Sequence, residues 1–248
     1  MRLVVLGAHG TWPLPGGATS GYLLQHDGFN LWVDLGTGTL ANLQRHVGLL
    51  DVGAAVISHR HPDHLVDLYP FFYARLFHPE RPAGLPLFAA PEVLDRVRAL
   101  VSDQGAADMA RVFDHRMVEP GQEFRAGPFR VRTAPMYHPV PTLGMRVEAG
   151  GKAVAYSADT GPTEELVQLA RGADVLVSEA TWPDPPADGP PTHLSGAQAG
   201  EHAARAGVGR LVLTHIWPTY DPSAVAERAA GRFDGPVILA EEGLVMDP

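Results

Sequence analysis

Short apolar runs alternate with polar segments along the whole chain, and their lengths predict a mixture of strands and helices. Apolar runs bounded by glycine, proline or polar residues are typical of buried strands. We predict strands at 3–6, 22–25, 31–34, 54–57, 85–89, 129–133, 152–157, 174–178, 210–214 and 237–240. Helical patterns that follow capping residues or begin near proline lie at 91–101, 162–170, 195–206 and 222–230. Strands outnumber helices and the two are interspersed, which indicates the α/β class.

Two stretches rich in glycine and proline, 7–20 and 182–191, predict loops. Composition does not shift across either stretch. We therefore expect a single domain over 1–248, with these loops beside a site and not between domains.

Composition narrows the chemistry. Because the chain contains no cysteine, disulfides, thiolate ligands and cysteine nucleophiles are excluded, and histidine, carboxylate and hydroxyl groups remain. The formal charge of −9 disfavours long nucleic acid, whose phosphates need local positive charge. No stretch approaches the roughly 20 apolar residues of a membrane span, and residues 1–7 are typical of a strand and not of a leader. We expect a cytoplasmic protein without a membrane partner.

Three histidines and one aspartate follow the apolar run 54–57, in the segment Ser58-His59-Arg60-His61-Pro62-Asp63-His64. Residues i and i+2 of an extended chain share a face, so His59 and His61 can converge on one cation. Pro62 suits a first helical turn, which would turn Asp63 and His64 in another direction. Imidazoles held together without a cation repel one another when protonated, so the segment predicts metal ligands.

The segment from His59 to His64 matches the His-x-His-x-Asp-His signature, and on it the chain resembles the metallo-β-lactamase-fold hydrolases. Four further residues match the family's other motifs in order: Asp34 in Val33-Asp34-Leu35-Gly36, His138 after Tyr137, Asp159 in Tyr156-Ser157-Ala158-Asp159, and His215 in Leu213-Thr214-His215. The resemblance implies a four-layer αβ/βα sandwich with metals at one edge and Asp34 as a support of the metal loop.

The resemblance also implies a ligand set for two divalent ions. His59, His61 and His138 would hold one ion, Asp63, His64 and His215 the other, and Asp159 would lie between them. Zn²⁺ suits this set best, while Mn²⁺ and Fe²⁺ stay open because no thiolate favours a soft metal. Two such ions activate a bridging hydroxide for hydrolysis. Asp63 would also orient or deprotonate the attacking water.

A further segment, Thr192-His193-Leu194-Ser195, resembles the ribonuclease Z-type phosphodiesterase branch, which implies that His193 is a non-ligand general acid. The alternative is that His193 only caps a helix. The interval 139–158 is too short for the arm with which tRNA-processing members grip their substrate.

The stretches 6–13, 35–38 and 67–69 resemble the atypical class II cyclic-nucleotide phosphodiesterases of actinobacteria. We expect a small phosphodiester or nucleotide substrate such as a 3′,5′-cyclic nucleotide. A ribonuclease Z-like RNA 3′-end endonuclease and a lactone or carboxylic-ester hydrolase are the alternatives.

Four residues near the motifs are weaker candidates for substrate contact. Arg60 and Arg146 could clamp a phosphate or form structural ion pairs. His9, in the first loop, and Trp217, after the last motif, could contact substrate or belong to surface and packing. The aromatic residues at 69–77 could stack on a nucleobase, but at this density on a predicted helix they favour core or a homodimer contact. We expect the loop 182–191 to close a cavity of mononucleotide size.

Overall fold

The computed structural model describes residues 1–186 and 191–248, which form two seven-stranded β-sheets. The first sheet contains, in spatial order, β14 (Val245–Met246), β1 (Arg2–Gly7), β2 (Gly21–His26), β3 (Phe29–Val33), β4 (Val52–Ile57), β5 (Leu85–Ala89) and β6 (Phe113–Met117). The second contains β13 (Val237–Leu239), β12 (Arg210–Thr214), β11 (Val175–Glu179), β10 (Lys152–Tyr156), β9 (Leu143–Ala149), β8 (Phe129–Pro135) and β7 (Glu123–Ala126).

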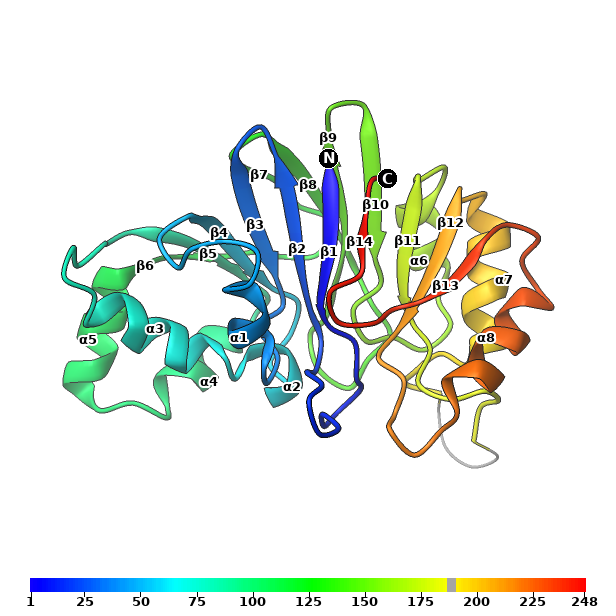
Figure 1. Cartoon of the computed structure of the whole chain (residues 1–248), viewed down its shortest axis with the longest axis horizontal. Coiled ribbons are helices and arrows are strands. Elements are labelled where there is room, and N and C mark those ends of the chain that lie inside the picture. Colours follow the sequence, from blue (N-terminus) through cyan, green and yellow to red (C-terminus); the bar gives the residue numbers. More distant parts are fainter. Residues whose placement is uncertain (187–190) are drawn as a thin grey trace.

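Both sheets mix parallel and antiparallel pairs. In the first sheet β14, β1, β2 and β3 pair antiparallel, while β3 to β6 pair in parallel. In the second, β7 to β10 pair antiparallel and β10 to β13 in parallel. The parallel strands β3, β4, β10, β11 and β12 end at the same edge of the molecule, the lower edge in Figure 1.

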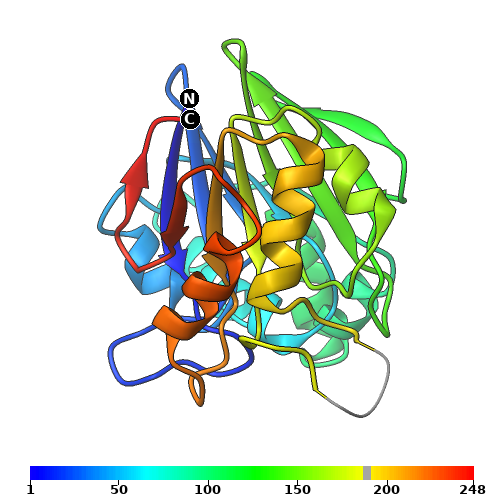
Figure 2. The same cartoon turned by 90° about the vertical axis from the view of Figure 1, so that its right-hand side faces the viewer.

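Helices cover the outer face of each sheet (Figures 1 and 2). The helices on the first half are α1 (Thr39–Leu43), α2 (Pro62–Leu65), α3 (Leu68–Leu76), α4 (Val93–Arg98) and α5 (Asp103–Val112). Those on the second half are α6 (Glu164–Ala170), α7 (Gly196–Ala206) and α8 (Pro222–Ala230). Among the described residues, no helix has the length and apolar character that a membrane span requires. The layers run helix, sheet, sheet, helix, which confirms the predicted αβ/βα sandwich.

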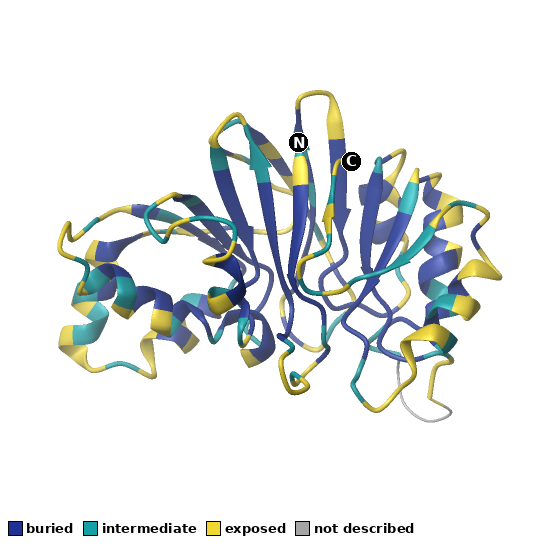
Figure 3. Cartoon of the chain, viewed as in Figure 1, coloured by how far each residue is buried: buried dark blue, intermediate teal, exposed yellow. Residues whose placement is uncertain are grey.

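The apolar core has two parts. One joins Val33 of the first sheet to Val154 and Val177 of the second and continues between the first sheet and its helices, where Phe71 and Met109 pack. The other lies between the second sheet and its helices, where Leu166, Ala203 and neighbouring side chains pack. Figure 3 shows the buried strands inside and the exposed residues on the outer helices and loops.

All ten predicted strands are present, and four others were missed. β6 and β7 are edge strands in which charged residues interrupt the apolar ones, and β14 has only two residues. β9 has the alternating burial of a strand, which the third motif at its start concealed. The helix predicted at 91–101 is shorter, because the chain turns after Arg98 and a second helix starts beyond Ser102, whose hydroxyl accepts from Gly105 N.

The aromatic helix α3 serves two surfaces. Phe71 and Phe72 are fully buried in the core. Tyr73 and Phe77 are exposed, and their rings stack with centroids 5.9 Å apart. The core role is therefore observed for two residues, and the homodimer contact stays a proposal for the other two.

Candidate metal centre

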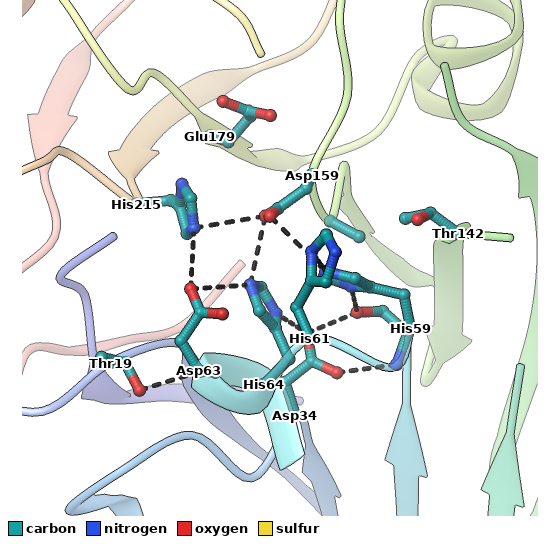
Figure 4. Close-up of polar contacts among 12 residues, drawn as sticks. Thr19, Asp34, His59, His61, Asp63, His64, Thr142, Asp159, Glu179 and His215 are labelled. Atoms are coloured by element: carbon teal, nitrogen blue, oxygen red, sulfur yellow. Dashed lines mark hydrogen bonds and ion pairs between the residues drawn. The ribbon is translucent and has the colours of Figure 1, made fainter. Parts of the chain in front are cut away.

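The seven predicted ligands converge at the edge where the parallel strands end. Figure 4 labels all of them except His138. His59 and His61 follow β4, Asp63 and His64 lie on α2, His138 lies between β8 and β9, Asp159 follows β10, and His215 follows β12. The backbone of Asp34, Ala158 and His215 is left-handed, with φ of 53°, 49° and 56°. Non-glycine residues rarely adopt this conformation, and such strain clusters at functional sites. The left-handed backbone at these three residues turns the chain sharply where β3, β10 and β12 end.

The first donor group consists of His59, His61, His138 and Asp159, whose ligand atoms all lie within 4.8 Å of one another. The Nδ1 atom of His61 lies 3.0 Å from His59 Nε2 and 3.1 Å from His138 Nε2. Two nitrogens bound to one tetrahedral zinc lie roughly 3.3 Å apart, because each Zn–N bond is about 2.0–2.1 Å. These nitrogens therefore have the spacing that one ion requires.

The second donor group consists of Asp63, His64 and His215. Asp63 Oδ2 lies 3.3 Å from His215 Nε2 and 3.6 Å from His64 Nε2. Asp159 faces both groups: its Oδ1 lies 3.2 Å from His64 Nε2, and its Oδ2 lies 3.5 Å from His59 Nε2. One carboxylate oxygen for each group is the geometry of a bridging ligand.

The donors fit two divalent cations on their own chemistry. His64 Nε2 and Asp159 Oδ1 are buried and, within the described part of the chain, lack a hydrogen-bond partner, although they face each other. A buried polar atom without a partner is costly, and metal ligation satisfies it. Burial lowers the pKa of His64, but Asp159, Asp63 and Asp34 outweigh burial and raise that pKa well above its usual range. The negative charge that raises it would equally attract a cation.

The ring nitrogens on the far side of the ligands are also held. His138 Nδ1 donates to the carbonyl of Thr192 at 3.1 Å, and His215 Nδ1 lies 3.2 Å from the hydroxyl of Thr181. Asp34 Oδ2 accepts from His64 Nδ1 at 2.7 Å. Such bonds orient ligand histidines and leave the opposite nitrogen free for the metal. The structure thus brings Asp34 to the support position.

The structure also places His193 beside both groups. Its ring stacks on His215 with centroids 5.4 Å apart and lies edge-on to His138 at 5.1 Å. Its Nδ1 donates to the two carboxylate oxygens of Glu179, at 3.0 and 3.2 Å. Burial lowers the pKa of His193, but the Glu179 carboxylate outweighs burial and raises it to about 9. A donor atom of His193 also lies within 4.8 Å of those of Asp159 and His215, which already belong to the first and the second donor group.

Glu179 is the residue that sequence reasoning missed. It ends the wholly buried strand β11 and also accepts from Thr160 N, Leu194 N and the Thr181 hydroxyl. A charged residue that ends an apolar run at the same edge as the motifs was the available signal.

Among the weaker candidates for substrate contact, both arginines are held by other parts of the chain. Arg60 Nε lies 2.6 Å from Glu92 Oε2, and Arg146 bonds Glu148 and the carbonyls of Leu169 and Arg171. These structural contacts do not bring either guanidinium into the donor groups.

His9 bonds Glu242 and the carbonyl of Ala18, so its ring is also held by structural partners. Trp217 lies near the site, with its ring 6.2 Å from that of His193 and 5.4 Å from that of Trp182. Residues 187–190 of the loop expected to close a cavity lie outside the described residues.

The layered fold and the paired donor groups define a protein of the metallo-β-lactamase fold. A family profile described as "Beta-lactamase superfamily domain" matches residues 30–216, and the chain belongs to this superfamily.

Its relatives include the uncharacterized protein Rv1339 of Mycobacterium tuberculosis (strain ATCC 25618 / H37Rv), 38% identical over 242 residues that cover 96% of this chain and 88% of the relative. The probable metallo-hydrolase YhfI of Bacillus subtilis (strain 168) is 29% identical over the full length of both chains. Its crystal structure has a TM-score of 0.88 and covers 100% of this chain and 98% of its own. A ribonuclease Z of Mycobacterium bovis (strain BCG / Pasteur 1173P2) is 31% identical, covering 98% of this chain and 96% of its own length.

Proposed function

We propose that the protein is a dinuclear metal-dependent phosphodiesterase that hydrolyses a small phosphodiester, with a 3′,5′-cyclic nucleotide as the specific candidate. The observation that carries the proposal is the position of His193, a chargeable imidazole held by buried Glu179 beside two donor groups that share Asp159. Two bound divalent ions, Zn²⁺ in the first place and Mn²⁺ or Fe²⁺ otherwise, would supply activation of water and neutralisation of phosphate charge.

Asp63 is suited to orient the attacking water. Its Oδ2 accepts from Thr11 N at 2.9 Å, which fixes the carboxylate beside His215. Burial raises the pKa of Asp63, but His64 and His215 outweigh burial and hold that pKa well below its usual range. The group is therefore a carboxylate at neutral pH and can orient a water molecule, whereas its low pKa makes it a weak base.

His193 is suited to the opposite task. Because its Nδ1 donates to Glu179, its Nε2 is the nitrogen that can serve the substrate. A raised pKa keeps the ring protonated at neutral pH. It can therefore donate a hydrogen bond to a phosphoryl oxygen or a proton to the leaving oxygen, where charge develops.

The molecule favours a small substrate over a tRNA. The interval between His138 and Asp159 is occupied by the antiparallel hairpin of β9 and β10, which pairs Ala149 with Lys152. A gripping arm has no room there, and the net charge of −9 opposes a polyanion. The similarity to a ribonuclease Z nevertheless makes RNA 3′ ends the second substrate to try.

The decisive experiment measures hydrolysis of 3′,5′-cyclic AMP by protein loaded with Zn²⁺ or Mn²⁺. We expect turnover that disappears in Asp159→Ala, because this carboxylate faces both donor groups. Asp63→Asn should lose turnover even when metal is supplied in excess. Absence of turnover in wild-type protein that holds two ions would contradict the proposal and direct the search to RNA ends, lactones and esters.

A further inference from the structure

Asp34 gathers four hydrogen bonds at the floor of the metal centre. Its Oδ1 accepts from Ser58 N at 2.7 Å. Its Oδ2 accepts from three donors: the Ser58 hydroxyl at 2.8 Å, His64 Nδ1 at 2.7 Å and the Tyr156 hydroxyl at 2.7 Å. Asp34, Ser58 and His64 are fully buried and Tyr156 nearly so, which excludes water as a substitute for any of these donors.

This network reaches one histidine in each donor group. His64, of the second group, donates directly to Asp34. The Ser58 hydroxyl gives its single proton to Asp34, so it must accept from His59 Nδ1, which lies 3.0 Å away. We therefore assign both rings the Nδ1–H tautomer, which leaves Nε2 of His59 and of His64 free to face the first and the second group.

The donors to Asp34 come from both sheets. Asp34 follows β3, while Ser58 and His64 follow β4, so these residues belong to the first sheet. Tyr156 is the last residue of β10 in the second sheet and stands three residues before Asp159. Its hydroxyl therefore links the hydrogen bonds around Asp34, which set the tautomers of the two histidines, to the strand that precedes the bridging carboxylate of Asp159.

We propose that Tyr156 is a positioning residue for both metal sites: by holding Asp34 from the opposite sheet, it keeps His59 and His64 aligned with the ligands of the second sheet. The inference rests on the metal centre of the proposed function but not on its substrate. Without the hydroxyl, the buried carboxylate has two donors to Oδ2 instead of three and can rotate. The histidines that it orients then lose their fixed direction.

The chain offers a matched control in Tyr22. It is buried beside Tyr156, with ring centroids 5.0 Å apart. Its hydroxyl also bridges the sheets, from β2 to Thr214 on β12 at 2.6 Å, and it donates none of the four hydrogen bonds to Asp34. Tyr22→Phe therefore removes a buried cross-sheet hydroxyl from the same layer and leaves the four bonds to Asp34 intact.

The experiment compares Zn²⁺ affinity of wild-type protein, Tyr156→Phe and Tyr22→Phe by competition with a chromophoric chelator at fixed pH. Mutation of a residue that hydrogen-bonds a metal ligand costs about 10–100-fold in metal affinity, and Tyr156 acts one bond further out, through Asp34, so its effect belongs at the low end of that range. We expect about a tenfold loss at each site in Tyr156→Phe and less than about a threefold loss in Tyr22→Phe. Unchanged affinity in folded Tyr156→Phe, or an equal loss in both variants, would overturn the proposal.

Nitrogen NMR of the histidine rings gives a second readout that general destabilisation does not produce. In the zinc-loaded wild type we expect slowly exchanging Nδ1 protons on His59 and His64. In Tyr156→Phe these two protons should exchange faster, while the Nδ1 proton of His138, which bonds the carbonyl of Thr192, keeps its rate. Unaltered exchange at all three rings would also overturn the proposal. Neither measurement uses a substrate, so a wild type that binds zinc without cleaving cyclic AMP refutes only the proposed function.

Discussion

The chemistry of His193 depends on a single neighbour. Burial alone would lower the pKa of this imidazole and leave it neutral, whereas the buried carboxylate of Glu179 raises that pKa to about 9. The ring is then protonated at pH 7–8, and the proton on Nε2 is available to a leaving oxygen. An exchange of carboxylate for carboxamide at Glu179 tests this dependence, because it alters the charge and keeps the size.

In Glu179→Gln we expect the pKa of His193 to fall, because burial still lowers this pKa and the carboxylate that raises it is removed. The alkaline limb of the kcat–pH profile should therefore move to lower pH. At pH 8, kcat for cyclic AMP should fall roughly 10²-fold, the scale on which a positioned general acid contributes. The measurement is a pH series of initial rates on metal-loaded protein at saturating substrate.

The leaving group supplies the internal control for Glu179→Gln. Because p-nitrophenolate departs without protonation, a p-nitrophenyl phosphodiester should lose much less activity than cyclic AMP. Glu227→Gln, at an exposed position on α8, should behave as wild type on both. Equal losses on the two substrates would mean that Glu179 supports the loops around it and does not tune His193.

At the scale of elements, sequence patterns predicted the strands whose apolar residues are buried. The strands with apolar runs were found, because a buried parallel strand needs apolar residues on both faces. Edge strands were not predicted, because they have no apolar run. The sequence of β6 is Phe-Asp-His-Arg-Met, in which only Phe113 is buried. The seven candidate ligands could be predicted because their spacing is local or matches a motif. The contacts of Glu179 and Tyr156 could not, since each depends on a partner that only strand pairing and sheet packing bring near.

The first loop and the chain after β13 are joined by an ion pair whose strength should depend on pH. His9 Nδ1 lies 3.2 Å from Glu242 Oε1, which also accepts from Ala18 N at 2.9 Å. The bond to Glu242 raises the pKa of His9 above 6.5, despite burial. Burial raises the pKa of Glu242, but the bonds from His9 and Ala18 outweigh it and lower that pKa below 4.5.

The sign of the pH effect follows from these two shifts. A raised histidine pKa stabilises the fold fully below pH 6.5, and this contribution is lost as pH rises through the folded value. A lowered glutamate pKa stabilises above pH 4.5 and is lost as pH falls through the folded value. The pair should therefore contribute most between pH 4.5 and 6.5.

We expect His9→Gln to lower Tm by about 2 °C near pH 5.5 and by less near pH 8.5, since a partly exposed pair contributes under about 1 kcal/mol. Thermal unfolding at both pH values, with His78→Gln as a half-buried histidine control outside the ion pair, measures the difference. A Tm difference that stays constant between these pH values would show that His9 acts by packing alone.

At the scale of the whole molecule, each ion would join the two sheets. The first group takes His59 and His61 from the first sheet and His138 from the second. The second group takes Asp63 and His64 from the first sheet and His215 from the second. An unfolded chain does not bring these donors together, so bound metal stabilises the folded state by mass action. Thermal stability should therefore depend on free zinc.

One ion bound only by the folded chain contributes about 1.4 kcal/mol for each tenfold rise in free metal above its Kd. For a domain of this size that corresponds to roughly 3–5 °C in Tm per tenfold rise, and to twice that when both sites fill together. Differential scanning fluorimetry in zinc buffers measures this slope. Asp159→Ala should flatten it, because its oxygens face both groups, whereas Asp114→Ala, an exposed carboxylate on β6, should leave it unchanged. A Tm that does not depend on free zinc in wild-type protein would mean that metal adds nothing to the apolar core and the cross-sheet hydrogen bonds of Tyr22 and Tyr156.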